Sequence, residues 1–154
     1  MSNDAYLTLQ GWVGSEVQLK NLDGGTTVAS FRVGSTARSF DKTQNLWVDR
    51  PTTWFTVDCW RSLAQNVAES INRGDPVVVY GRLRTNEWTE NGEPRSRTLI
   101  EAFSVGHDLS RGTTTFRKQL PSGFAGTPSP FDDLPVLGAE ELDPFSTSSS
   151  SEAA

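Results

Sequence analysis

Residues 52–88 read TTWFTVDCWRSLAQNVAESINRGDPVVVYGRLRTNEW, and this stretch contains the pattern that decides the fold. Residues 52–60 are rich in β-branched and aromatic side chains, which favour a strand. The period then changes, because Leu63, Val67 and Ile71 recur every four residues. That spacing places them on one apolar face of a helix. The stretch therefore predicts a helix that directly follows a strand.

The elements around this helix predict the fold class. Gly74 and Pro76 are typical of a helix end, since glycine caps the last turn and proline cannot continue it. Strand patterns cover residues 6–17, 26–40, 52–60, 77–88 and 97–105, with a polar loop at 41–51. Asn91-Gly92 is a turn signal, inside a connection longer than a tight hairpin. A helix between the third and fourth strands predicts an all-β OB-fold, a five-stranded Greek-key barrel used for oligonucleotides and oligosaccharides.

Composition divides the chain into two parts. Residues 1–111 hold the large apolar side chains, and we predict that they form the barrel domain. Residues 112–154 are rich in Gly, Pro, Ser and Thr, which predicts a disordered tail. The first part carries 12 basic and 13 acidic residues, and the tail carries 2 and 6. The body is therefore nearly neutral, so a nucleic-acid contact would need a local basic patch.

Several function classes are excluded by what the sequence lacks. The single cysteine, Cys59, can form neither an internal disulfide nor a cysteine zinc cluster. No apolar run approaches the roughly 20 residues of a membrane span, and the first residues do not follow a signal pattern. His107 is the only histidine and has no convergent ligands in the sequence pattern. We expect a cytoplasmic, nucleoid-associated protein with no membrane, small-molecule substrate, cofactor, metal or catalytic residue.

The side chains of each predicted strand divide between two faces, because residues two apart in a strand share a face. We call this assignment of residues to faces parity. Trp54 and Trp60 share the polar face of residues 52–60, opposite an apolar face made by Phe55, Val57 and Cys59. In residues 77–88, Trp88 shares a face with Tyr80, Arg82 and Arg84, provided that no bulge intervenes. Aromatic side chains interleaved with arginines thus lie opposite the predicted core.

This pattern favours binding of single-stranded DNA. Every base has a π-face, so stacking on aromatic rings works without regard to sequence, while basic side chains neutralise phosphates. The candidate phosphate contacts are Arg32, Arg38, Lys42, Arg61, Arg73, Arg82, Arg84, Arg95 and Arg97. Trp12 and Trp47 fit packing better than binding. The alternative is a protein-interaction module, in which the aromatic face is a subunit or partner interface.

Residues 5 to about 108 also resemble the core domain of bacterial single-stranded-DNA-binding proteins. The matching segments are Ser39-Phe40-Asp41-Lys42, Thr53-Trp54-Phe55-Thr56-Val57 with Trp60, Leu63-Ala64, Arg73-Gly74-Asp75, Gly81-Arg82-Leu83-Arg84-Thr85 with Trp88, Asn91-Gly92 and Arg95. The resemblance implies base stacking on Phe40, Trp54, Trp60 and Trp88. Phe40 replaces a tryptophan and Trp60 a phenylalanine, so aromatic rings are retained. It also implies a homotetramer serving replication, repair, recombination or chromosome segregation.

The tail departs from the family pattern. Family members usually end in an acidic stretch closed by Pro-Phe, which recruits replication and repair proteins. Here nine residues follow Asp143-Pro144-Phe145. We therefore expect weak recruitment, as in a specialised second copy.

Cys59 has two interpretations. It alternates with predicted core positions, which favours a buried free thiol. The alternative is a disulfide between the subunits of an oligomer, which would need Cα atoms within about 7 Å.

Overall fold

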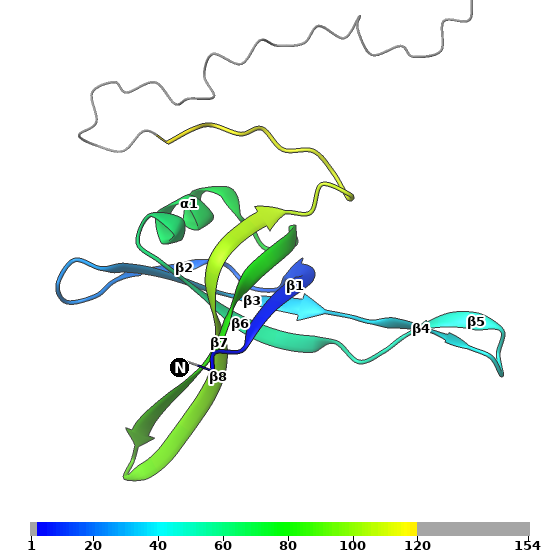
Figure 1. The fold of residues 1–154 in the computed structure, drawn as a ribbon, viewed down its shortest axis with the longest axis horizontal. Helices are drawn as coiled ribbons and strands as arrows, with labels where there is room; N and C mark the ends of the chain where they lie inside the picture. The colour runs from blue at the N-terminus through cyan, green and yellow to red at the C-terminus, as the bar shows by residue number, and fades with distance from the viewer. Residues whose placement is uncertain (1–2, 120–154) are drawn as a thin grey trace, which may run out of the picture. The chain divides into compact units, whose positions relative to one another are not determined.

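The computed structural model describes residues 3–119, which form eight strands and one helix (Figure 1). The elements are β1 (Tyr6–Val13), β2 (Gln18–Asn21), β3 (Thr27–Ser35), β4 (Arg38–Asp41), β5 (Leu46–Asp49), β6 (Thr53–Trp60), α1 (Ser62–Ser70), β7 (Pro76–Glu90) and β8 (Glu93–His107). Most of the predicted disordered tail lies outside the described residues, so its disorder stays a prediction. No helix among the described residues is long and apolar enough to cross a membrane.

Five of the strands form a closed ring. β1 pairs with β7 along its length and with β3 at its end, and β3, β6, β8 and β7 complete the ring in that order. β6 and β8 run parallel, whereas the other described strand pairs are antiparallel. Where β1 meets β3, a Cβ on Gly11 would lie 2.3 Å from the Gly34 carbonyl oxygen. Only glycine therefore permits the backbone approach that closes the barrel.

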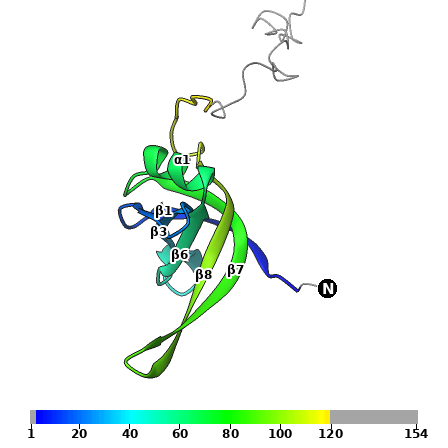
Figure 2. The same cartoon turned by 90° about the vertical axis from the view of Figure 1, so that its left-hand side faces the viewer.

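The barrel interior follows the predicted alternation. Phe31, Val57, Val79 and Ile100 point inward from four strands and are fully or almost fully buried. α1 lies across one end of the barrel, where its apolar face adds Ala64, Val67 and the following Ile71 to the same core (Figure 2). The predicted helix is confirmed, because its apolar period is set by this burial, but it ends at Ser70, before the predicted end at Gly74.

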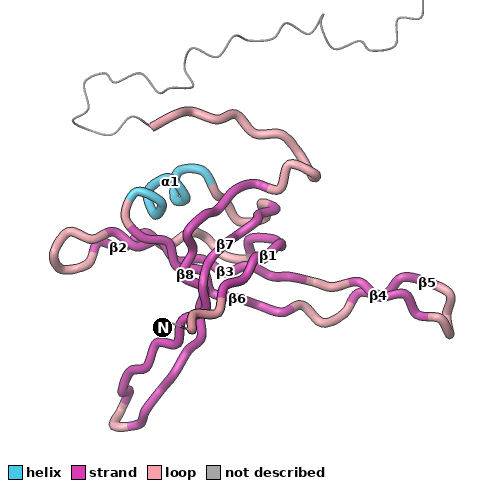
Figure 3. Tube along the Cα trace, in the orientation of Figure 1, coloured by secondary structure: helices cyan, strands magenta, loops and turns pink. Residues whose placement is uncertain are grey.

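The strand count differs from the prediction. The predicted strand at residues 26–40 is two strands, β3 and β4, and the predicted loop at residues 41–51 contains β5. β4 and β5 form a separate two-stranded sheet, joined to the barrel by short loops (Figure 3). The predicted strand at 6–17 stops at Val13, and β2 follows as an extra edge strand on β3. The all-β class with one helix between the third and fourth ring strands is confirmed.

The β7–β8 hairpin is also longer than predicted. Its strands continue to Glu90 and Glu93, and a two-residue turn joins them. Asn91 and Gly92 have φ angles of 53° and 79°, the left-handed values that a tight twisted hairpin requires. The hairpin and the β4–β5 sheet extend from the barrel as two arms in different directions (Figure 1).

Cys59 is a fully buried core residue. A disulfide to a second copy would require the barrel to open, so the structure favours the buried free thiol over the intersubunit disulfide. Burial raises the pKa of the Cys59 thiol from 9.0 to about 12, and the nearby negative charge of Asp58 adds to the shift. The folded thiol is therefore neutral and shielded at physiological pH.

We predict that a thiol reagent labels Cys59 only when the barrel opens. At about pH 8 an exposed cysteine, with a pKa near 8.5, is partly ionised and reacts readily. The folded protein should remain unlabelled, and the denatured protein should label fully, as measured by intact mass. Rapid labelling of folded protein would contradict the buried position.

Candidate nucleic-acid interface

The outer face of β6 presents two tryptophans. Trp54 and Trp60 are both exposed, whereas Val57 and Cys59 between them point into the core. The two tryptophans are six positions apart, which corresponds to about 20 Å along an extended strand. The parity argument from the sequence therefore predicted this face correctly.

The Trp54 ring packs against Gly14 and Gly34, which together we call its seat. A Cβ built on Gly14 would lie 2.2 Å from the Trp54 ring, and one built on Gly34 would lie 3.0 Å from it. The guanidinium of Arg32 lies 5.3 Å from the centroid of the same ring, a cation–π contact. The ring is thus held against backbone on one side while half of the side chain stays exposed. Sequence reasoning missed both glycines, because the seat joins segments far apart in the chain.

Polar side chains occupy the strip between the two tryptophans. Arg97 of β8 donates a hydrogen bond to the Thr56 hydroxyl, which directs its charge onto the β6 face. Ser30 donates to the Asp58 carboxylate at 2.6 Å. The Asp58 carboxylate is therefore satisfied by a neighbour. In residues 3–119, no three His, Cys, Asp or Glu side chains lie close enough to hold a metal ion.

The β4–β5 arm carries the third candidate stacking residue. Phe40 lies directly opposite Trp47 in the register, and both are exposed. Arg38 pairs with Asp49 at 2.8 Å, so its charge is compensated. Lys42 lies in the turn between β4 and β5 and makes no ion pair with a described residue.

The β7–β8 arm carries the fourth, Trp88. It lies opposite Arg95 and lines a shallow hollow with Glu87, Thr89, Pro94, Arg95 and Ser96. Arg95 lies 3.5 Å from Glu90 and 3.8 Å from Glu93. These pairs are exposed and therefore weak, so a phosphate could replace either carboxylate.

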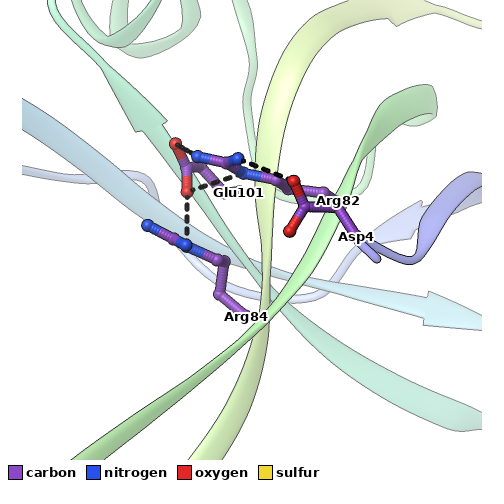
Figure 4. Close-up of polar contacts among 4 residues, drawn as sticks. All are labelled: Asp4, Arg82, Arg84 and Glu101. Carbon is purple, nitrogen blue, oxygen red and sulfur yellow. Dashed lines mark hydrogen bonds and ion pairs between the residues drawn. The ribbon is translucent and has the colours of Figure 1, made fainter. Parts of the chain in front are cut away.

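Arg82 is not a free cation. Its guanidinium lies between Glu101 and Asp4, at 3.2 Å and 3.3 Å, and Glu101 also binds Arg84 at 3.0 Å (Figure 4). The hydrogen bonds that Arg82 donates to Glu101 raise the pKa of its guanidinium above the ordinary value. Parity placed Arg82 on the correct outer face, but its two carboxylate partners argue against the predicted phosphate contact.

A second aromatic surface lies beyond this charged network. Tyr6, Tyr80 and Phe103 form a cluster with ring centroids 6.1–6.4 Å apart, and all three are exposed. Tyr80 pairs with Ser104 and Gly81 with Ala102, so Phe103 is the extra residue of a β-bulge. The bulge turns Phe103 outward, toward the two tyrosines. Parity placed Tyr80 on the outer face, but it did not identify Tyr6 and Phe103 as its neighbours.

The remaining candidate residues lie outside β6 and the two arms. Arg61 immediately precedes α1 with a positive φ angle of 58°, and Arg73 follows the helix. Trp12 lies beside Gly34 in the register, with Arg111 5.0 Å from its ring centroid. The tail residues Asp143, Pro144 and Phe145 lie outside the described residues.

Residues 5–108 match the family described as the single-strand binding protein family. The chain is 40% identical over 130 residues to Single-stranded DNA-binding protein 2 of Tropheryma whipplei, which spans 82% of this chain and 86% of that protein. It also resembles the small single-stranded DNA-binding protein of Streptomyces coelicolor, with a TM-score of 0.64, 38% identity and coverage of 73% and 100% of the two chains. A complex of the Plasmodium falciparum protein with single-stranded DNA aligns with a TM-score of 0.57, 25% identity and coverage of 66% and 88%. The chain therefore belongs to the single-strand binding protein family, which confirms the resemblance seen in its motifs.

We predict that Gly14→Ala displaces the Trp54 ring. Gly14 has no left-handed backbone angle, so the new methyl group acts through its clash with the ring and not through backbone strain. The tryptophan emission should shift, and quenching by acrylamide should increase. Gly106→Ala is the matched control, because a Cβ there meets nothing within 4 Å. Equal spectra for the two variants would contradict the proposed seat.

Proposed function

We propose that this protein binds single-stranded DNA without sequence preference and catalyses no reaction. The observation that carries the proposal is the placement of Phe40, Trp54, Trp60 and Trp88 as exposed rings on β6 and on two arms. None of the four belongs to the core cluster, so their rings are available to bases. Stacking on such rings contributes roughly 1–3 kcal/mol per base. The relative from Plasmodium falciparum, solved with single-stranded DNA, supports the same substrate class.

The charge pattern supports a binding mode that depends more on stacking than on phosphates. Among the nine predicted phosphate contacts, Arg38, Arg82, Arg84 and Arg95 have carboxylate partners. The other five, without an ion pair to a described residue, are Arg32, Lys42, Arg61, Arg73 and Arg97. If each neutralises one phosphate, the affinity should fall with a log–log salt slope of roughly −3.5.

The biological setting follows from the substrate. Single-stranded DNA arises in replication, repair, recombination and chromosome segregation, and we propose that the protein protects it there, in association with the nucleoid. We propose that recruitment of partner proteins through Asp143-Pro144-Phe145 is weak, because nine residues follow that motif.

We predict that oligo(dT) quenches the tryptophan fluorescence of the protein and that duplex DNA does not. Trp54→Ala and Trp88→Ala should each weaken binding by about fivefold or more, the equivalent of one lost stacking contact. Leu109→Ala changes an exposed apolar residue that lies on neither β6 nor the two arms, and this variant should bind normally. Absence of quenching and of binding at both low and high salt would disprove the proposed function.

We also propose that the chain forms a homotetramer and that the cluster of Tyr6, Tyr80 and Phe103 is a contact between subunits. Three neighbouring exposed rings are costly to leave in water, and aromatic residues are enriched in interfaces. The charged network of Arg82 and Glu101 separates this cluster from Asp58 on the β6 face, since Glu101 pairs with both in the register. The protein therefore has one aromatic surface for DNA and another for its own copies.

We predict that Tyr80→Glu lowers the oligomeric state. A carboxylate placed among the rings would lose water on assembly without gaining a partner. Native mass spectrometry should show tetramer for the wild type and smaller species for the variant. Wild-type protein that remains monomeric at micromolar concentration would contradict the proposal.

A further inference from the structure

The β4–β5 arm carries a second ring that no core covers. Trp47 is 60% exposed, the highest value among the five tryptophans, and its partner Phe40 is 44% exposed. Their centroids lie 5.7 Å apart, with the ring planes inclined by 65°. β4 and β5 pair only with each other in the described sheets, so nothing behind the arm explains an apolar face there.

The charges around this pair of rings favour an anion. Asp41 accepts hydrogen bonds from two backbone N–H groups of the turn, and Asp49 pairs with Arg38. Both carboxylates of the arm are therefore engaged within it. Lys42 and Arg50 have no carboxylate partner among residues 3–119, although Arg50 donates a hydrogen bond to the Ser39 hydroxyl. The arm thus combines two exposed rings with two uncompensated cations.

We propose that Trp47 is a further base-binding residue, which together with Phe40 makes the β4–β5 arm a site for two bases of a single strand. The proposal rests on the proposed function and adds a contact that the sequence interpretation assigned to packing. Because the two ring planes are inclined, bases stacked on them lie in different planes. The strand must therefore turn where it crosses the arm.

A role in packing alone accounts for less of the geometry. A cross-strand aromatic pair stabilises a hairpin that has no core of its own. An edge-to-face contact satisfies that role while covering only part of each ring. It does not explain why two cations lie on the same arm as the exposed parts of the rings. A stacked base would cover a ring, and its phosphate would compensate a cation.

The direct test is a variant in which Trp47 is the only tryptophan. Trp12, Trp54, Trp60 and Trp88 are each replaced by phenylalanine, which retains a ring for stacking. Binding of labelled oligo(dT) is followed by anisotropy, and Trp47 emission is followed in the same titration. Quenching in step with binding supports the proposal. Unchanged emission while the DNA binds overturns it, and leaves the proposed function intact.

Single substitutions keep the proposal testable if that variant folds poorly. Trp47→Leu keeps apolar bulk on the arm but removes the π-face, and should weaken oligo(dT) binding about fivefold or more. Trp47→Phe should retain most of the affinity. Leu46→Ala is the control, since Leu46 is the adjacent exposed apolar residue on the opposite face of β5. Wild-type affinity in Trp47→Leu, or an equal loss in Leu46→Ala, overturns the proposal. Failure of the wild type to bind disproves the proposed function itself.

Discussion

The close contact between Gly11 and Gly34 is the constraint on which the structure depends. β1 can pair with β7 and still reach β3 only because no side chain stands between these two backbones. The same Gly34 lies opposite Trp54 in the neighbouring strand pair and forms part of the seat for its ring. Barrel closure requires that Gly11 lacks a Cβ, whereas the seat of the Trp54 ring requires that Gly34 lacks one. Two neighbouring glycines on β1 and β3 therefore serve the closure of the barrel and the orientation of a candidate binding residue.

The division of the arginines into compensated and uncompensated groups explains how a nearly neutral domain can suit an anionic ligand. Asp4 and Glu101 together compensate Arg82 and Arg84, which removes two positive charges from the count that composition suggests. Arg32 and Arg97 instead lie against Trp54 and Thr56, on the outer surface of β6. Positive charge is thus concentrated beside the rings. Net charge alone would have argued against nucleic acid, and local placement reverses that argument.

The sequence predicted correctly those elements that bury one side, because burial imposes a regular spacing on their apolar residues. The helix and the two faces of β6 could be read from residues 52–71, because one side of each element faces the core. The β4–β5 arm has no core to face, so Lys42 and its polar neighbours resembled a loop. The Phe103 bulge and the Gly14 seat depend on contacts between distant segments, and parity along one strand carries no information about them. The same limitation applies to Arg82, whose face was predicted but whose partners were not.

The separation of the candidate rings among β6 and two arms has a consequence for exchange of the ligand. A strand held at several independent places behaves as a multivalent ligand, because each contact raises the effective concentration for the next one. One contact can then open while the others hold, so a competing strand or an enzyme can gain access base by base. Tight overall attachment and rapid local release are compatible in such an arrangement. A single deep pocket would force a choice between them.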